Sequence, residues 1–231
     1  MTTADDLCRD SLDGLSVGDA LGAQFFVPGT SLAQLAVGRL PPPWPWTDDT
    51  EMACSVAVET RRTGGVDQDR LAASFGEHFE PYRGYGGGAV VLLRQMAVAA
   101  AEAGRARAER RRPEPAELLD TVLDHLVDSR VTAGIERARR LLGADAGEAA
   151  YELGNGARVL AQDTVPFTLW TAATFLHDYP AAILTCIRAG GDVDTTAAIV
   201  GGIVATFTGT GPGGIPGDWL AAREPLPDRS T

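Results

Sequence analysis

Apolar residues recur at helical spacing along almost the whole chain, and the alternating pattern of β-strands is almost absent. Hydrophobic residues make up 45% of the 231 residues and charged residues 22%, a balance typical of a globular protein rather than a disordered one. The length suits one domain with a substantial core. We therefore predict an all-α fold with a single domain over residues 1–231. The predicted helices span Asp5–Phe25, Asp48–Arg62, Gln68–Phe79, Ala89–Ala108, Pro115–Val127, Thr132–Leu142, Phe167–His177, Tyr179–Arg188 and Thr195–Phe207.

The first predicted helix carries three glycines four residues apart, Gly14, Gly18 and Gly22. A glycine inside a helix costs about 1 kcal/mol relative to alanine, so three in register suggest a structural role. They predict a flat helix face against which another backbone packs closely. The proline-rich segment Pro41–Trp46 cannot be helical and is expected to form an extended connector that leads to Thr47.

The net charge of −11 does not favour a surface for nucleic acid or for an anionic membrane. A basic run at 105–112 lacks interleaved aromatic residues and is typical of a solvated helix end. The stretch Ala197–Phe207, which is continuously apolar apart from Gly and Thr, is too short to span a membrane. The polar start of the chain predicts no signal peptide, and the odd number of widely spaced cysteines (Cys8, Cys54 and Cys186) predicts reduced thiols. We expect a cytoplasmic protein that binds neither nucleic acid nor membranes.

Two acidic segments that are far apart in the sequence each precede an apolar helical run, Trp46–Glu51 and Gly190–Ala198. Either segment alone is typical of a helix start, because Asp and Thr are good N-caps and acids complement the helix dipole. Asp192 and Asp194 would lie about 200° apart on a helix. We therefore expect Asp192 on the preceding glycine loop and Asp194 near the N-cap of the next helix.

Together the two segments suggest a site for cations, in addition to marking two helix starts. If they meet in the fold, four carboxylates lie close together and repel one another unless cations neutralise them. Carboxylate and hydroxyl oxygens are the ligands that Mg²⁺ and Mn²⁺ prefer. The four carboxylates are those of Asp48, Asp49, Asp192 and Asp194.

Three motifs in a fixed order, Gly18–Gly22, Thr47–Thr50 and Gly191–Ala198, together resemble the ADP-ribosylglycohydrolase family. This family includes the dinitrogenase reductase-activating glycohydrolase and the ADP-ribosyl-acceptor hydrolases. Tyr85–Gly88 and Leu153–Phe167 also resemble family segments. The resemblance implies a compact all-α bundle around a central site for two ions, Mg²⁺ or Mn²⁺. The metal ligands that it implies are Thr47, Asp48, Asp49, Asp192, Asp194 and Thr195.

The resemblance also implies the activity. The expected reaction is hydrolysis of the glycosidic bond between ADP-ribose and a protein side chain or small molecule. Asp49 and Asp194 are the expected catalytic residues, and Asp194 is expected to bridge the two ions.

The chain departs from the family pattern at two places. Phe26 stands where the family often has a Glu, and a loop and a Thr-His segment that contact the diphosphate and ribose are absent after about Met96. An internally shortened chain is therefore expected. The alternative function is that of a degenerate member that binds metal or ADP-ribose without turning it over.

Overall fold

The computed structural model describes residues 2–84, 89–127 and 129–230, and the side chains of these residues except 63, 81, 89–97 and 229. Helices account for 67% of the residues. Within the described ranges the only strand-like pairing is an isolated bridge between Trp44 and Arg223. The predicted all-α class is confirmed. In chain order the helices are α1 (Ala4–Gln24), α2 (Leu32–Ala36), α3 (Asp48–Thr63), α4 (Gln68–Glu77), η1 (Pro81–Arg83), α5 (Ala89–Ala108), α6 (Pro115–Leu123), α7 (Arg130–Arg140), α8 (Ala146–Leu153), α9 (Ala161–Thr174), α10 (Tyr179–Ala189), α11 (Val193–Thr208), α12 (Gly217–Ala222) and η2 (Asp228–Ser230).

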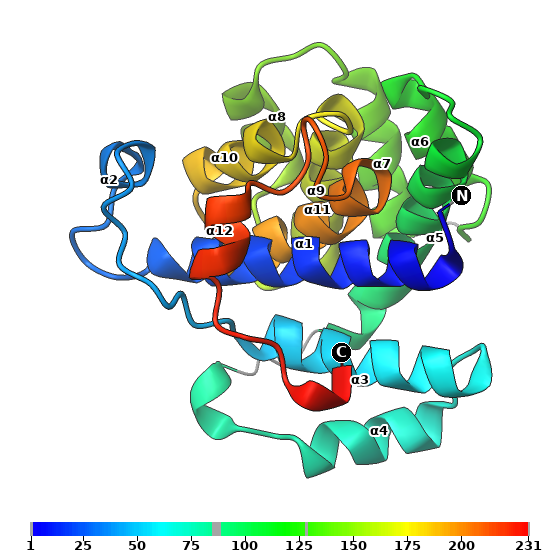
Figure 1. The fold of residues 1–231 in the computed structure, drawn as a ribbon. Helices are drawn as coiled ribbons and strands as arrows, with labels where there is room; N and C mark the ends of the chain where they lie inside the picture. The colour runs from blue at the N-terminus through cyan, green and yellow to red at the C-terminus, as the bar shows by residue number, and fades with distance from the viewer. Residues whose placement is uncertain (1, 85–88, 128, 231) are drawn as a thin grey trace.

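Helix α1 lies between the α3–α4 pair on one side and the helices α6–α11 on the other (Figure 1). Its most extensive contact is with α11, which also packs against α5, α9 and α10. The largest fully buried side chains are those of Trp170, Tyr179 and Phe167. The Tyr179 hydroxyl donates a hydrogen bond of 2.6 Å to the carbonyl of Gly14, which joins α10 to α1. No helix of the described residues combines the length and apolar character needed to cross a lipid bilayer.

The glycine stripe of α1 packs against the backbone of α11, as the sequence predicts. A Cβ atom at Gly14 would lie 2.4 Å from the carbonyl oxygen of Gly201, and one at Gly18 would lie 2.2 Å from that of Ala197. At Gly22 a Cβ atom would lie 2.7 Å from the Cα atom of Asp194. Because position numbers rise along α1 as they fall along α11, the two helices are antiparallel. The stripe therefore fixes the start of α11 beside the end of α1.

Some predicted helix boundaries were wrong. Helix α9 begins at Ala161 rather than Phe167 and contains Pro166 in its interior. A proline there removes one helical hydrogen bond, but nearly the whole of α9 is buried, so tertiary packing outweighs that loss. Helix α6 ends at Leu123, four residues before the predicted end. The short helices α2, α8 and α12 were not predicted, since none is long enough to show a clear period.

Candidate metal centre

Three aspartates from three helices meet at one point. Asp19 of α1, Asp49 of α3 and Asp194 of α11 each offer a carboxylate oxygen, and these oxygens lie within 4.8 Å of one another. Asp19 is fully buried, whereas Asp49 and Asp194 are partly open to solvent. The close contact of α1 with α11 at Gly22 brings Asp194 to this point.

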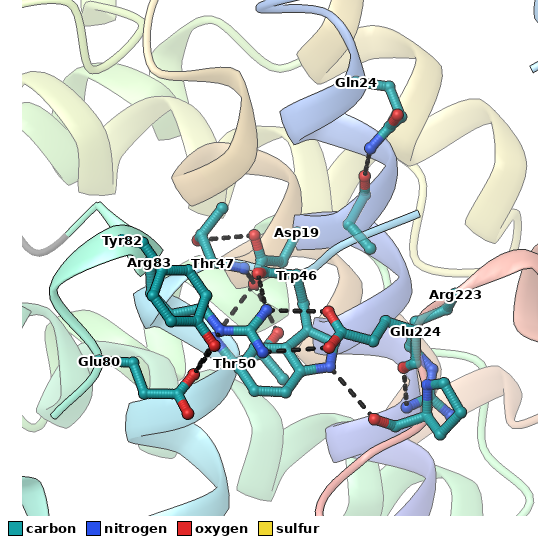
Figure 2. A network of polar contacts seen from close by, with 12 residues as sticks. Asp19, Gln24, Trp46, Thr47, Thr50, Glu80, Tyr82, Arg83, Arg223 and Glu224 are labelled. Atoms are coloured by element: carbon teal, nitrogen blue, oxygen red, sulfur yellow. Dashed lines mark hydrogen bonds and ion pairs between the residues drawn. The ribbon is translucent and has the colours of Figure 1, made fainter. Parts of the chain in front are cut away.

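Asp19 holds the start of α3 in place. Its carboxylate accepts hydrogen bonds from the backbone N–H groups of Thr47 (2.9 Å) and Thr50 (3.1 Å). It also accepts bonds from the hydroxyls of Thr47 (2.8 Å) and Thr50 (2.5 Å), as Figure 2 shows. Thr47 is the N-cap of α3 but makes no side-chain capping bond of its own. A carboxylate from α1 therefore satisfies N–H groups that a local cap would normally satisfy.

Asp19 is absent from the ligand set that the resemblance implies. It belongs to the Gly18–Gly22 motif, for which the resemblance implies no metal ligand. The signal that could have found it is a single acid in the buried, glycine-rich half of α1, since a buried carboxylate needs several hydrogen-bond donors.

The start of α11 differs slightly from the prediction. Asp192, expected on the preceding loop, is itself the N-cap of α11, and Asp194 lies near the cap as expected, in the first turn. Gly190 and Gly191 before it have φ values of +65° and +77°, as expected for a glycine-dependent loop. The carboxyl group of Asp192 lies close enough to that of Asp194 to raise its pKa. The non-helical backbone of Asp192 explains how two residues that would diverge on a helix can meet.

Two further predicted residues lie at these helix starts, and one of them, Thr195, connects α11 to α3. The hydroxyl of Thr195 donates a hydrogen bond of 2.9 Å to Asp49, which joins α11 to α3. The N–H of Thr195 donates one of 2.8 Å to Asp194. Asp48 lies close enough to Asp49 for its charge to raise the pKa of that carboxyl. A Cβ atom at Gly84 would lie 3.6 Å from Oδ1 of Asp48, so the end of η1 faces this group.

Burial among like charges raises the pKa of all three central carboxyls. Burial is the largest cause for Asp19, whose pKa rises to about 7. The pKa of Asp194 also rises to about 7, through burial first and then through the neighbouring carboxyl of Asp192. Burial raises the pKa of Asp49 well above its usual range, and the charges of Asp19, Asp48 and Asp194 raise it further. A divalent cation would remove this repulsion by supplying positive charge.

The donor chemistry fits a divalent cation. Burial apart, the described side chains that shift the pKa values of the three carboxyls most are other carboxyls and threonine hydroxyls. The hydroxyls of Thr47 and Thr195 each donate their proton to a carboxylate, so their oxygen lone pairs remain available to a cation. Oxygen atoms of both kinds are ligands that Mg²⁺ and Mn²⁺ accept.

Two other sequence features have clear places in the fold. Phe26 lies just after α1 with 55% of its surface exposed, and its ring offers no metal ligand. The loop after α8 lies against the second acidic segment, because the carbonyl of Asn155 accepts a hydrogen bond of 3.1 Å from the N–H of Asp192. The segment Tyr85–Gly88 lies outside the described residues.

Comparison with known protein families identifies the family of the chain. The ADP-ribosylglycohydrolase family model matches residues 1–97 and 78–230. The chain belongs to this family. The two matches overlap at residues 78–97, which agrees with a lost internal segment near Met96. No curated protein matches the chain. Hydrolysis of ADP-ribose linkages is the general activity of the family.

Proposed function

We propose that this chain hydrolyses the glycosidic bond between ADP-ribose and an acceptor, and that the reaction depends on two divalent ions, Mg²⁺ or Mn²⁺. The observation that supports this most is the meeting of Asp49 and Asp194, which lie on helices far apart in the sequence of a family member. The substrate would be an ADP-ribosylated protein or small molecule. Residues 1–231 would act as one shortened domain in the cytoplasm, where the three free cysteines would stay reduced.

The proposed ligands come from the two acidic helix starts. Helix α3 and its N-cap would bind the ions from one side, and α11 with its N-cap from the other. Asp194 would bridge the two ions. Asp19 would hold the start of α3 in place rather than serve as a ligand, because its carboxylate already accepts four hydrogen bonds from Thr47 and Thr50. The proposed ligands are Thr47, Asp48, Asp49, Asp192, Asp194 and Thr195.

Bound ions would fix the vicinal hydroxyls of the distal ribose and lower the pKa of a water molecule. The water oxygen would attack C1″ of that ribose, and the bond from C1″ to the acceptor nitrogen or oxygen would break. Asp49 and Asp194 are the proposed catalytic residues. Their carboxylates would orient the water and accept its proton, which then passes to the leaving group. The hydrogen bond from Thr195 keeps the carboxylate of Asp49 in a fixed direction.

A second candidate is a member that binds metal or ADP-ribose without turnover. Phe26 favours it, because a phenyl ring cannot coordinate an ion or move a proton. The loop that is missing after about Met96 also favours it, since substrate positioning can lower a barrier by several kcal/mol. We therefore expect slow hydrolysis at most.

The deciding assay measures free ADP-ribose released from peptides with ADP-ribosyl-arginine or ADP-ribosyl-serine, with Mg²⁺, with Mn²⁺ and with EDTA. We expect slow release that requires metal and is lost in Asp49→Ala. Asp145→Asn is the matched control, because Asp145 caps α8 at the surface and asparagine is an equally good cap.

The other outcomes separate the candidates. Calorimetric binding of ADP-ribose without release would favour the second candidate. A chain that neither binds metal nor releases ADP-ribose would contradict both. Rapid release would show that the missing loop is not needed.

A further inference from the structure

The connector before α3, Pro41–Trp46, is hydrogen-bonded to residues 222–225 near the C-terminus. Trp44 donates its N–H to the carbonyl of Ala222 (2.6 Å), and Glu224 donates its N–H to the carbonyl of Trp44 (2.9 Å). The indole N–H of Trp46 donates to the carbonyl of Pro225 (3.4 Å). The two indole rings are almost fully buried. The segment 222–225 therefore lies along the connector that delivers the chain to Thr47.

Arg83 joins these two segments to each other. Its guanidinium donates two hydrogen bonds to the carboxylate of Glu224, of 2.8 and 3.0 Å, and one of 2.8 Å to the carbonyl of Trp46. A fourth bond, of 3.0 Å, goes to Glu80. The guanidinium also stacks on the Trp46 ring, with Cζ 3.4 Å from the ring centroid. Figure 2 shows these groups together, beside Asp19 and Thr47.

The position of Arg83 links this network to the candidate metal centre. The carbonyl that it binds belongs to the residue directly before Thr47, which is the N-cap of α3 and a partner of Asp19. The next residue after Arg83 is Gly84, which faces Asp48. A shift of the Trp46 peptide would therefore move the N-terminus of α3 relative to Asp194.

We propose that Arg83 is a positioning residue for the metal centre. Together with Glu224, it holds the Trp46 peptide so that Asp49 meets Asp194. This inference rests on the proposed function, because it assumes that the acidic cluster binds metal. The hydrogen bonds of Arg83 go to Glu80, Glu224 and the carbonyl of Trp46, none of which belongs to the cluster, so its effect on metal affinity would act through the Trp46 peptide. Loss of groups that orient metal ligands typically weakens binding about 10- to 100-fold.

The test measures the Kd of Mn²⁺ by isothermal titration calorimetry. The temperature is one at which circular dichroism shows that each variant is folded. We expect Arg83→Met to weaken binding about 10- to 100-fold. Arg83→Lys should weaken it less, because lysine keeps the charge but loses the two-pronged contact with Glu224. Glu224→Gln should also weaken it. The double variant should bind about as weakly as Arg83→Met alone, since the pair acts as a unit. If Arg83→Met does not fold, the lysine and glutamine variants carry the test.

Arg107→Met is the matched control. Arg107 is also partly buried, bonds a carboxylate, that of Asp10 (2.5 Å), and donates to a backbone carbonyl, that of Thr206 (3.1 Å). Asp10 lies nine residues before Asp19, or about 13 Å along α1. A purely structural role of Arg83 predicts that both methionine variants lose stability and keep the wild-type Kd, and that result would overturn the inference. A wild-type chain that binds no metal would instead end the proposed function, and the inference with it.

Discussion

Gly18 of α1 lies so close to Ala197 of α11 that an added Cβ atom would be 2.2 Å from the Ala197 carbonyl oxygen. The obstacle is backbone, so no side-chain rotation can relieve it. Asp19 follows Gly18 directly, and Asp194 lies one turn before Ala197. The same contact that packs the two central helices therefore sets the separation of two of the three clustered carboxylates.

Gly18→Ala should lower the free energy of unfolding by about 3 kcal/mol or more, because the helices must move apart. Urea denaturation followed by circular dichroism measures the loss. Gly76→Ala is the control, since Gly76 is an exposed helical residue of α4 with nothing within 4 Å of an added Cβ. It should be neutral or stabilising by up to about 1 kcal/mol. Equal effects of the two substitutions would contradict the close-packing argument.

Thr50→Val should destabilise the protein by about 1–2 kcal/mol, because it removes a fully buried hydroxyl that donates to Asp19. Thr171 provides a matched control. Its side chain is equally buried, but its hydroxyl has no hydrogen-bond partner among the described residues. Thr171→Val should therefore cost nothing or stabilise slightly. Thermal and urea unfolding of the two variants test the difference, and a harmless Thr50→Val would show that the cap from Asp19 is weak.

Much of this architecture follows from local signals in the sequence. The glycine stripe predicted close packing because Gly14, Gly18 and Gly22 share one helix face. The sequence could not identify α11 as the partner, since that depends on tertiary packing. Asp19 shows the same limit at the site. Its four bonds go to Thr47 and Thr50, which lie 28 and 31 residues away, and no local spacing encodes them.

Asp194→Asn should raise the melting temperature of the metal-free protein, near pH 8. Its charged form is disfavoured by burial and by Asp192, and an amide keeps the bond from Thr195 without the charge. The gain should be about 1–2 kcal/mol, less than the pKa shift alone implies because Asp194 is partly open to solvent. The same variant should lose the stabilisation by Mg²⁺ or Mn²⁺ that we expect of the wild type. Asp145→Asn, at a surface cap, should change neither quantity. A metal-dependent shift that persists in Asp194→Asn would exclude this residue as a bridging ligand.

The metal-free protein should become less stable as the pH rises from about 4 to about 7. The folded-state pKa values of Asp19 and Asp194 are raised from 3.8 to about 7, so in this window the folded protein holds more protons than the unfolded chain. The stability that these groups contribute is fully present below their unfolded pKa and is lost as the pH rises through the folded value. Ions bind the deprotonated carboxylates, so the stabilisation by Mg²⁺ should grow over the same range. Melting temperatures in EDTA and in saturating MgCl₂ measure both trends, and Asp194→Asn should flatten each. If the gap between the two curves stays constant with pH, metal binding does not involve these carboxyls.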